Sequence, residues 1–342
     1  MADEHQHFYG GQAVIEGVMM RAPERWAVAV RRASGRVNLF IREEVALGRK
    51  YVWARRPLIR GCVGIYESLG MGWYSLQASA TMAMDDALPE GAKRPKSSTI
   101  GALSGVLAAA LGIGLFFIFP TVVTGWIVGV HAPVAPHDVQ GSIVKNAIEG
   151  GVRLVIILLY IGGVGFMPDI RRVFQYHGAE HATINCYEAG EPVTVDNVMR
   201  HSVLHPRCGT SFLLTVVFVK LVVNCFLGWP ALWIRVILRI AILPVVAALA
   251  YEAIYYAGRH RDGLFARIMA APGMAVELLT TRHHTRDQAE IAIYALAAVA
   301  PDVPLPADLE PADIWTPVQS TAPEGVPASV EATPAPEDAP LS

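Results

Sequence analysis

Two histidines and a glutamate lie within one helical turn of the stretch YHGAEHATINCYE at residues 176–188. His177, Glu180 and His181 occupy positions i, i+3 and i+4, so on a helix they project from one face. Two imidazoles one turn apart can bind one zinc ion, and a carboxylate between them can hold and deprotonate water. The order H-x-x-E-H is the inverted zinc-peptidase signature. The alternative is a solvated helix face on which Glu180 pairs with nearby arginines.

A zinc site needs three or four ligands, and this helix supplies only two. Downstream, Pro206 and Gly209 predict a bend that turns His205 and Cys208 back toward the helix. Glu252, in a later apolar segment, is another candidate because an ionisable group inside a membrane span is functional by default. Cys208 could equally be a small buried apolar residue. The predicted ligands of a divalent metal, most simply zinc, are therefore His177, His181, His205, Cys208 and Glu252, with Glu180 as the catalytic carboxylate.

The composition favours an integral membrane protein. Of the 342 residues, 53% are hydrophobic and 17% are charged, against about 25% charged residues in an ordinary soluble domain. Residues 301–342 hold eight acids and no Lys or Arg, so 28 bases face 22 acids in the rest, as expected beside an anionic leaflet. The four cysteines include no CxxC pair, which argues against a disulfide framework. No phosphate-binding loop or nucleic-acid-binding stripe is present.

Four apolar segments predict transmembrane helices, at residues 100–130, 142–167, 212–227 and 236–256. Pro120 predicts a kink in the first span or its far end. A further helix is expected from Pro57 to Thr81, lying on the membrane or partly in it, which leaves a fifth span open.

The basic residues predict the orientation of these spans. Residues 21–60 contain eleven Lys or Arg and three acids, and further basic residues lie in 168–209 and 259–286. The connection at 131–141 contains no Lys or Arg. The positive-inside rule therefore places the three basic regions, and both termini, in the cytoplasm.

The fold class predicted is mainly α: an integral membrane protein of about four transmembrane helices with a small β-rich unit and cytoplasmic helices. Residues 26–31 and 37–42 flank a Gly-containing turn and predict a β-hairpin. Glu16, ahead of it, is either a surface carboxylate or a residue beside the active centre. The expected organisation is a β-rich unit (8–56), a membrane-associated helix and linker (57–95), a first transmembrane pair (96–168), the HxxEH and HPRC segment (169–209), a second pair (210–258), cytoplasmic helices at 273–281 and 285–299 (within 259–300), and a disordered acidic Pro/Ala-rich tail (301–342).

Three strings resemble the YqhQ family of bacterial membrane proteins: GGQAVIEGVMMR (10–21), YHGAEHATINCYE (176–188) and HPRCGTSF (205–212). The segment APGMAVELLTTR (271–282) looks like the closing motif of the same family, so the resemblance covers about residues 8–300. It implies a multispanning protein of the bacterial cytoplasmic membrane and a metal-dependent enzyme, an activity that for the family is itself a prediction. It also supports His177, Glu180, His181, His205 and Cys208 as a site.

Two functions remain open on the sequence. The first is a membrane-embedded zinc hydrolase, with its site at the cytoplasmic face and a peptide or amphiphilic substrate. The second is a non-catalytic membrane protein, either an ion transporter that uses Lys220, Glu149 and Glu252 or an assembly scaffold. Transport requires these charges to line one continuous path. The expected surroundings are the lipid bilayer, without nucleic acid.

Overall fold

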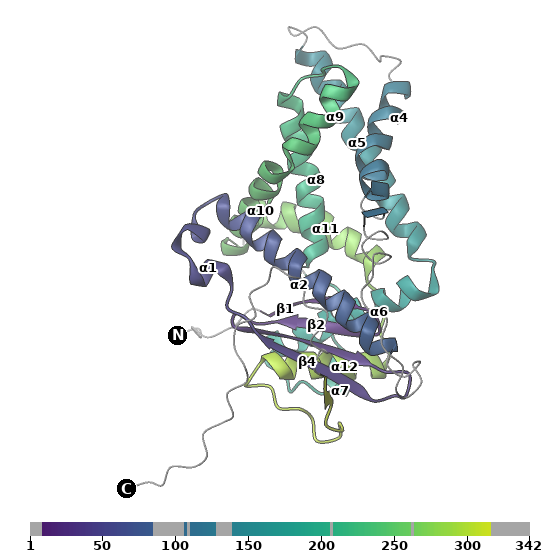
Figure 1. Ribbon diagram of the computed structural model, residues 1–342, viewed down its shortest axis with the longest axis vertical. Coiled ribbons are helices and arrows are strands. Elements are labelled where there is room, and N and C mark those ends of the chain that lie inside the picture. Colours follow the sequence, from purple (N-terminus) through teal and green to yellow (C-terminus); the bar gives the residue numbers. More distant parts are fainter. Residues whose placement is uncertain are drawn as a thin grey trace.

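The computed structural model describes residues 9–84, 106–107, 110–127, 139–205, 208–260 and 263–315. Figure 1 shows a bundle of helices standing on a lobe that contains a small sheet. The bundle contains α4 (Phe119–Ile127), α5 (Val139–Val164), α8 (Gly209–Phe226), α9 (Leu232–Ala241), α10 (Leu243–Arg259) and α11 (Leu264–Thr280). The lobe contains the strands, α6 (Pro168–Glu188), α7 (Val195–Val198) and α12 (Arg286–Val299), with α1 (Leu47–Lys50), η1 (Val52–Arg55) and α2 (Ile59–Met84) beside it.

The sheet has five strands in the order β1-β2-β3-β4-β5. The first four are an antiparallel meander of β1 (Gly10–Val14), β2 (Gly17–Arg21), β3 (Arg25–Arg31) and β4 (Val37–Glu43). The predicted hairpin is confirmed, because β3 pairs with β4 from Arg31↔Val37 to Arg25↔Glu43. The sheet is larger than the sequence indicated, since the glycine-rich segment ahead of the hairpin forms two further strands.

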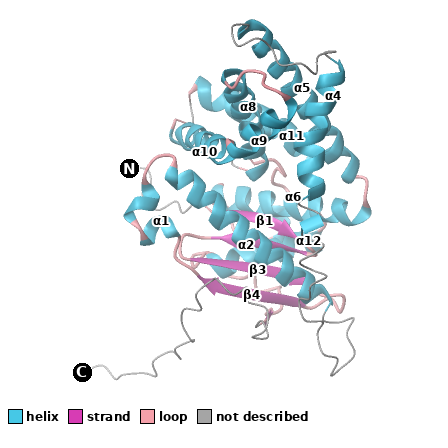
Figure 2. Ribbon diagram, turned by 45° about the horizontal axis from the view of Figure 1, so that its top comes forward, coloured by secondary structure: helices cyan, strands magenta, loops and turns pink. Residues whose placement is uncertain are grey.

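Helices cover both faces of this sheet, as Figure 2 shows for α2. Since side chains alternate along a strand, β3 buries Val28 against α2 and its neighbours Ala27 and Ala29 against α6 and α12. The strand is therefore apolar along its whole central length instead of alternating between apolar and polar residues. Packing against Ala27 and Ala29 therefore holds α6 on one face of the sheet.

The tail does not follow the prediction of disorder from residue 301 onward. Residues 313–314 form β5, which pairs parallel with β4 at Asn38↔Asp313 and Leu39↔Ile314. Val303 is buried, and the Tyr294 hydroxyl donates a hydrogen bond to the Glu310 carbonyl. A few apolar side chains can anchor a Pro-rich segment where a sheet edge already exists, which composition alone does not reveal. Residues 316–342 lie outside the described residues.

The four predicted membrane spans are supported only in part. In the described part of the chain, two helices are long and apolar enough to cross a membrane, Ala110–Ile127 and Val139–Val164. The pair α9 and α10 makes a third candidate if it counts as one bent span, whereas the apolar part of α8 (Phe212–Phe226) is shorter. A membrane association is therefore plausible, and the count of four spans is not confirmed.

Two prolines account for departures from straight helices. The predicted helix 236–256 is divided into α9 and α10, which meet at an angle of 44° around Ile242. Pro244, in the first turn of α10, has no N–H to continue the hydrogen bonding of α9. Pro120 follows a π-helical turn, η3 (Gly114–Ile118), and the helix continues beyond it to Ile127.

The HxxEH motif lies on a helix, α6, as the spacing of its residues indicated. The helix begins at Pro168, a residue suited to the first turn, and ends before Gly190, which has φ of +72°. Gly178, inside it, lets the backbone approach closely: a Cβ there would lie 2.1 Å from the carbonyl oxygen of Arg282. α6 is thereby held against the connection between α11 and α12.

The segment after the bundle differs from its prediction at the first of two helices. The second, α12, begins with a capping box, in which the side chains of Thr285 and Gln288 each accept a hydrogen bond from the other's backbone N–H. The first, α11, runs from Leu264 through Pro272 to Thr280, much longer than the predicted 273–281. It packs against α8, α10 and α5, so it belongs to the helical bundle.

Candidate metal centre

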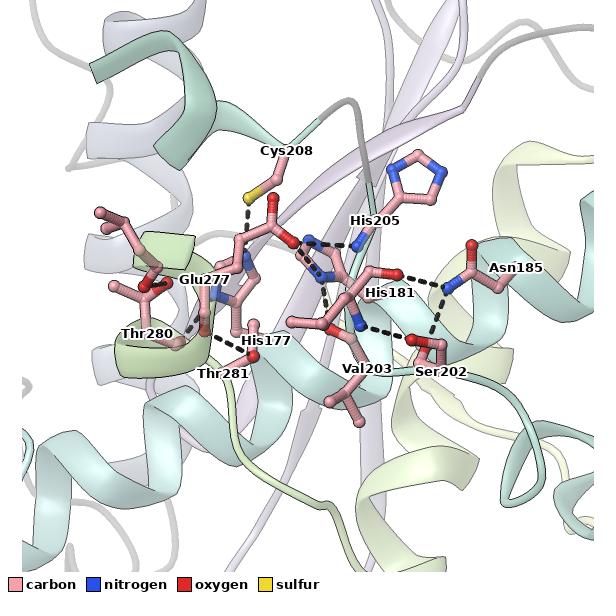
Figure 3. Close-up of polar contacts among 12 residues, drawn as sticks. His177, His181, Asn185, Ser202, Val203, His205, Cys208, Glu277, Thr280 and Thr281 are labelled. Carbon is pink, nitrogen blue, oxygen red and sulfur yellow. Dashed lines mark hydrogen bonds and ion pairs between the residues drawn. The ribbon is translucent and has the colours of Figure 1, made fainter. Parts of the chain in front are cut away.

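Three segments distant in the sequence meet where the bundle rests on the lobe (Figure 3). The middle of α6 contributes His177 and His181, and the connection ahead of α8 contributes Cys208. The C-terminal end of α11 contributes Glu277 and the backbone of Thr280. The bend predicted at Pro206 and Gly209 therefore has the expected result, although residues 206–207 themselves are outside the described part.

Two histidines and a cysteine of this cluster could hold a metal ion. His177, His181 and Cys208 each offer a ligand atom, and these atoms all lie within 4.8 Å of one another. His177 Nε2 lies 3.2 Å from Cys208 Sγ, and the two imidazole centroids are 4.4 Å apart. Two imidazoles with one thiolate suit zinc, and three protein ligands are the number found in catalytic zinc sites.

Backbone carbonyls orient both imidazoles. His177 Nδ1 lies 2.9 Å from the Thr280 carbonyl oxygen, and His181 Nδ1 lies 2.7 Å from that of Val203. A carbonyl can only accept, so each Nδ1 carries the proton of the neutral ring and each Nε2 keeps its lone pair. Carbonyl partners of this kind typically hold histidine ligands of metals in position.

Burial keeps His181 in the form that a metal requires. The residue is 2% exposed, and burial, with the nearby His177, lowers its pKa to about 3. An imidazolium cannot bind a cation, whereas a neutral ring can. His181 is therefore available as a ligand throughout the neutral range.

Glu180 lies beside the ligands in an apolar setting on the sheet side of α6. It is 4% exposed, and burial raises the pKa of its carboxyl to about 7. His177 and a hydrogen bond from the Gly11 backbone lower this pKa, but by less than burial raises it. Its Oε2 is buried and has no hydrogen-bond partner in the described structure. Gly11 is required here, because a Cβ would lie 2.8 Å from the carboxylate. The motif GGQAVIEG thus contributes a strand whose backbone at Gly11 packs directly against the Glu180 carboxylate.

Glu277 is the buried acid that the sequence analysis missed. It is fully buried; its Oε2 accepts a hydrogen bond of 2.9 Å from the His205 backbone N–H and lies 3.9 Å from His181 Nδ1. The same signal that drew attention to Glu252, an acid in an apolar helix, was present at Glu277. It was overlooked because the sequence predicted a short cytoplasmic helix there.

The structure does not bring two of the predicted ligands into the group. Figure 3 shows the His205 ring directed away from Cys208, and its Nε2 lies 3.6 Å from a Glu188 carboxylate oxygen. Glu252 instead binds the Arg60 guanidinium through both oxygens and accepts the Leu58 N–H at 3.0 Å. His205 therefore supports the centre through its backbone, while Glu252 joins α10 to the start of α2.

Glu16 holds α6 in place from outside the centre. It lies at the β1–β2 turn with φ of +52°, and both of its carboxylate oxygens bind Arg172. The Tyr176 hydroxyl also donates to it, at 3.3 Å. Of the two interpretations of Glu16, the described contacts favour a partly exposed structural carboxylate.

A second group of potential ligands, Cys186, Glu191 and His201, lies near the C-terminal end of α6. The Cys186 thiol donates to the Pro192 carbonyl at 3.6 Å, and burial raises its pKa to about 11. A protonated thiol and an exposed carboxylate suit a structural contact better than a metal site. The cluster around His177 remains the better candidate.

Replacing the missed acid should weaken metal binding without unfolding the protein. Glu277→Gln keeps an acceptor for the His205 N–H but removes the negative charge beside His181. We expect zinc affinity, measured by competition with a chromophoric chelator, to fall by at least about tenfold. Glu252→Gln is the matched control, because it removes an equivalent charge that binds Arg60. A weaker zinc affinity in the control alone would mean that the ligand set is different.

Comparisons with known proteins agree with the family resemblance. The family described as "Protein of unknown function (DUF1385)" matches residues 56–302. The chain is 34% identical over 286 residues to "Uncharacterized protein YqhQ" of Bacillus subtilis (strain 168), covering 83% of this chain and 90% of that protein. No solved structure matches the chain. With a family match over more than half of its length and a relative aligned over most of both sequences, the chain belongs to the DUF1385 family.

Proposed function

We propose that the protein is a zinc-dependent hydrolase whose active centre lies at the cytoplasmic end of its membrane helices. The observation that carries the proposal is the convergence of His177, His181 and Cys208, with both Nδ1 atoms already bonded to carbonyls. Three ligands with a carboxylate beside them are the parts that hydrolytic zinc sites use.

Each part has a distinct role in this proposal. A zinc ion held by the two Nε2 atoms and Sγ would act as a Lewis acid that polarises a carbonyl and acidifies water. Glu180 accepts the proton of the attacking water through its unpartnered Oε2 and returns it to the leaving group. A pKa of about 7 is close to the optimum for this exchange at neutral pH.

The surroundings favour a peptide or an amphiphile as the substrate. The centre lies between α6 of the lobe and α11 of the bundle, and α2 runs between the sheet and the bundle (Figure 1). The most exposed large side chains of α2 are Tyr66 at 72%, Leu69 at 69% and Trp73 at 56%. Aromatic and aliphatic side chains of this kind suit contact with the membrane interface, from which such a substrate could enter.

Chelation of the full-length protein tests the hydrolase directly. We expect the protein in liposomes to cleave members of a mixed peptide and lipopeptide library, to stop when 1,10-phenanthroline is added, and to recover with zinc. Library members without Lys or Arg represent substrates that partition into the membrane, and charged members represent soluble substrates. Comparing their cleavage separates the two classes. Cleavage that persists under chelation would contradict a metal mechanism.

We also propose four spans with both termini in the cytoplasm. The convergence of residues 177–181, Cys208 and Glu277 supports this topology, because segments that meet at one site must share one side of the membrane. Ala110–Ile127 and Val139–Val164, which are long and apolar enough to cross, would form the first crossing and return. α8 and the bent pair α9–α10 would supply the second crossing and return.

Impermeant thiol labelling of intact cells checks this topology. Cysteines introduced one at a time at Ser34, Gln140 and Thr285, all exposed positions, are compared with the parent chain. Only the cysteine at 140 should gain label, because it lies in the connection without Lys or Arg. Label at 34 or 285, but not at 140, would invert the orientation.

The contacts of the described residues count against the transport alternative, which requires its charges to line one path. Glu252 is bound to Arg60 and Leu58, whereas Lys220 interacts with Glu149 and Arg153 in another part of the bundle. The proposed charges therefore belong to two separate clusters in the described structure. The scaffold alternative is tested by the Glu180 variant discussed below.

A further inference from the structure

The helical bundle contains a second cluster of buried polar residues, away from the metal centre. It lies among α4, α5, α8 and α9, which extend from the lobe toward the opposite end of the molecule (Figure 1). Its charged members are each at most 5% exposed: Glu149, Arg153, Lys220, Arg235 and Arg239. The cluster is independent of the hydrolase proposal, since none of these residues belongs to the metal centre.

The charges of this cluster do not balance. Glu149 is the only acid in the sequences of α4, α5, α8 and α9, whereas four of the buried residues are cationic. Arginine keeps its charge in proteins, so even a neutral Lys220 leaves a net charge of at least two. Buried charge in a membrane helix is costly unless it is compensated.

The one carboxylate is already used by two of the cations. Glu149 Oε1 accepts from Arg153 Nη2 at 2.8 Å, from Thr121 at 3.0 Å, and from Arg239 Nη1. Arg239 also donates to Asn146 Oδ1 at 2.8 Å. Arg153 and Arg239 therefore each have a carboxylate partner, whereas no carboxylate of the described residues forms a salt bridge with Arg235.

Arg235 is the residue that points to a missing ligand. It is 3% exposed, and its guanidinium carbon lies 3.8 Å from the ring centroid of Trp229, which is also buried. Its Nε and Nη1 have no hydrogen-bond partner in the described structure. Stacking satisfies the face of a guanidinium, but its N–H groups lie in the plane and still require acceptors.

We propose that this cluster binds a phosphate-type oxyanion through Arg235, with Arg239 and Lys220 contributing charge. Arg239 lies over the same Trp229 ring at 5.6 Å, and Lys220 interacts electrostatically with Arg153 and Arg239. A planar guanidinium beside further cations matches the several acceptor oxygens of a phosphate. A lipid headgroup and a free phosphate share this chemistry.

Binding to the full-length protein in a neutral detergent tests the proposal in two arms. The first arm measures inorganic phosphate by equilibrium dialysis, and the second measures short-chain phosphatidylglycerol against phosphatidylcholine by native mass spectrometry. Saturable binding in the first arm identifies a free anion, and retention of phosphatidylglycerol over phosphatidylcholine identifies a lipid headgroup. Binding in neither arm overturns the proposal.

Matched variants assign the site. Arg235→Gln should weaken the binding by at least about tenfold, because it removes a charge-assisted donor. Arg36→Gln, which changes an exposed arginine of the lobe, should leave it unchanged. If Arg235→Gln does not purify as a folded protein, Lys220→Gln is expected to produce the same weakening. Wild-type affinity in the folded variant would show that the anion binds elsewhere.

Discussion

Replacing Glu180 by glutamine (Glu180→Gln) should lower turnover by at least about 100-fold and leave zinc binding intact. The amide keeps the size of the side chain and its place beside Gly11 but cannot accept the proton of the attacking water. The measurement is single-turnover cleavage together with zinc content. Glu188→Gln, on the same helix but partly exposed, is the control and should remain active. Full cleavage activity in Glu180→Gln would contradict the role of Glu180 as the proton acceptor, whereas wild-type function in cells that carry this variant, without cleavage, would favour the scaffold alternative.

The same variant should be more stable than the parent chain once the metal is removed. The pKa of Glu180 is raised from 4.5 to about 7, so the folded state binds more protons than the unfolded state between these pH values. The chelated parent therefore loses stability as the pH rises through this window, by about 3 kcal/mol for a shift of this size. Glu180→Gln lacks this loss, so a decrease of activity in the variant cannot be attributed to unfolding.

Replacing His181 by alanine (His181→Ala) should reduce zinc affinity by at least about 100-fold, since the loss of outer-shell partners alone costs 10–100-fold. It removes one of three ligands and leaves the Val203 carbonyl without its donor. Competition with a chromophoric chelator measures the affinity, and chelator-induced lowering of Tm provides a second readout. His283→Ala, at an exposed histidine, is the control.

A second substitution separates a metal role from a packing role. His177→Ala should produce a similar loss of affinity, because His177 Nε2 lies against Cys208 Sγ. With cobalt in place of zinc, Cys208→Ser should remove the sulfur-to-metal charge-transfer absorption. Zinc affinity within twofold of wild type in both histidine variants would contradict the ligand assignment.

Local patterns in the sequence were enough to predict the parts of the site that lie on one helix. His177, Glu180 and His181 share a face of α6 because their spacing matches a helical turn, and the Pro168 start and Gly190 end define that helix. Cys208 could be predicted as a member of the site because Pro206 and Gly209, on either side of it, indicated a turn. These features depend on residues close together in the chain.

The rest depended on contacts between distant segments. Glu277 enters the centre because α11 continues through Pro272 and packs on α8, whereas the sequence predicted only a short helix from residue 273. Glu252 and Glu277 both lie in apolar helices, and only tertiary packing decides that one meets Arg60 and the other His181. Similarly, β5 forms because the tail finds the open edge of β4, which no local pattern predicts.

The metal content of the purified protein tests the central claim most directly. Full-length protein, purified without chelator, is analysed by inductively coupled plasma mass spectrometry beside the His177→Ala/His181→Ala double variant, with circular dichroism to establish that both are folded. We expect about one zinc per chain in the wild type and almost none in the folded double variant. Equal metal content in the two proteins, or none in the wild type even after incubation with zinc, would contradict it.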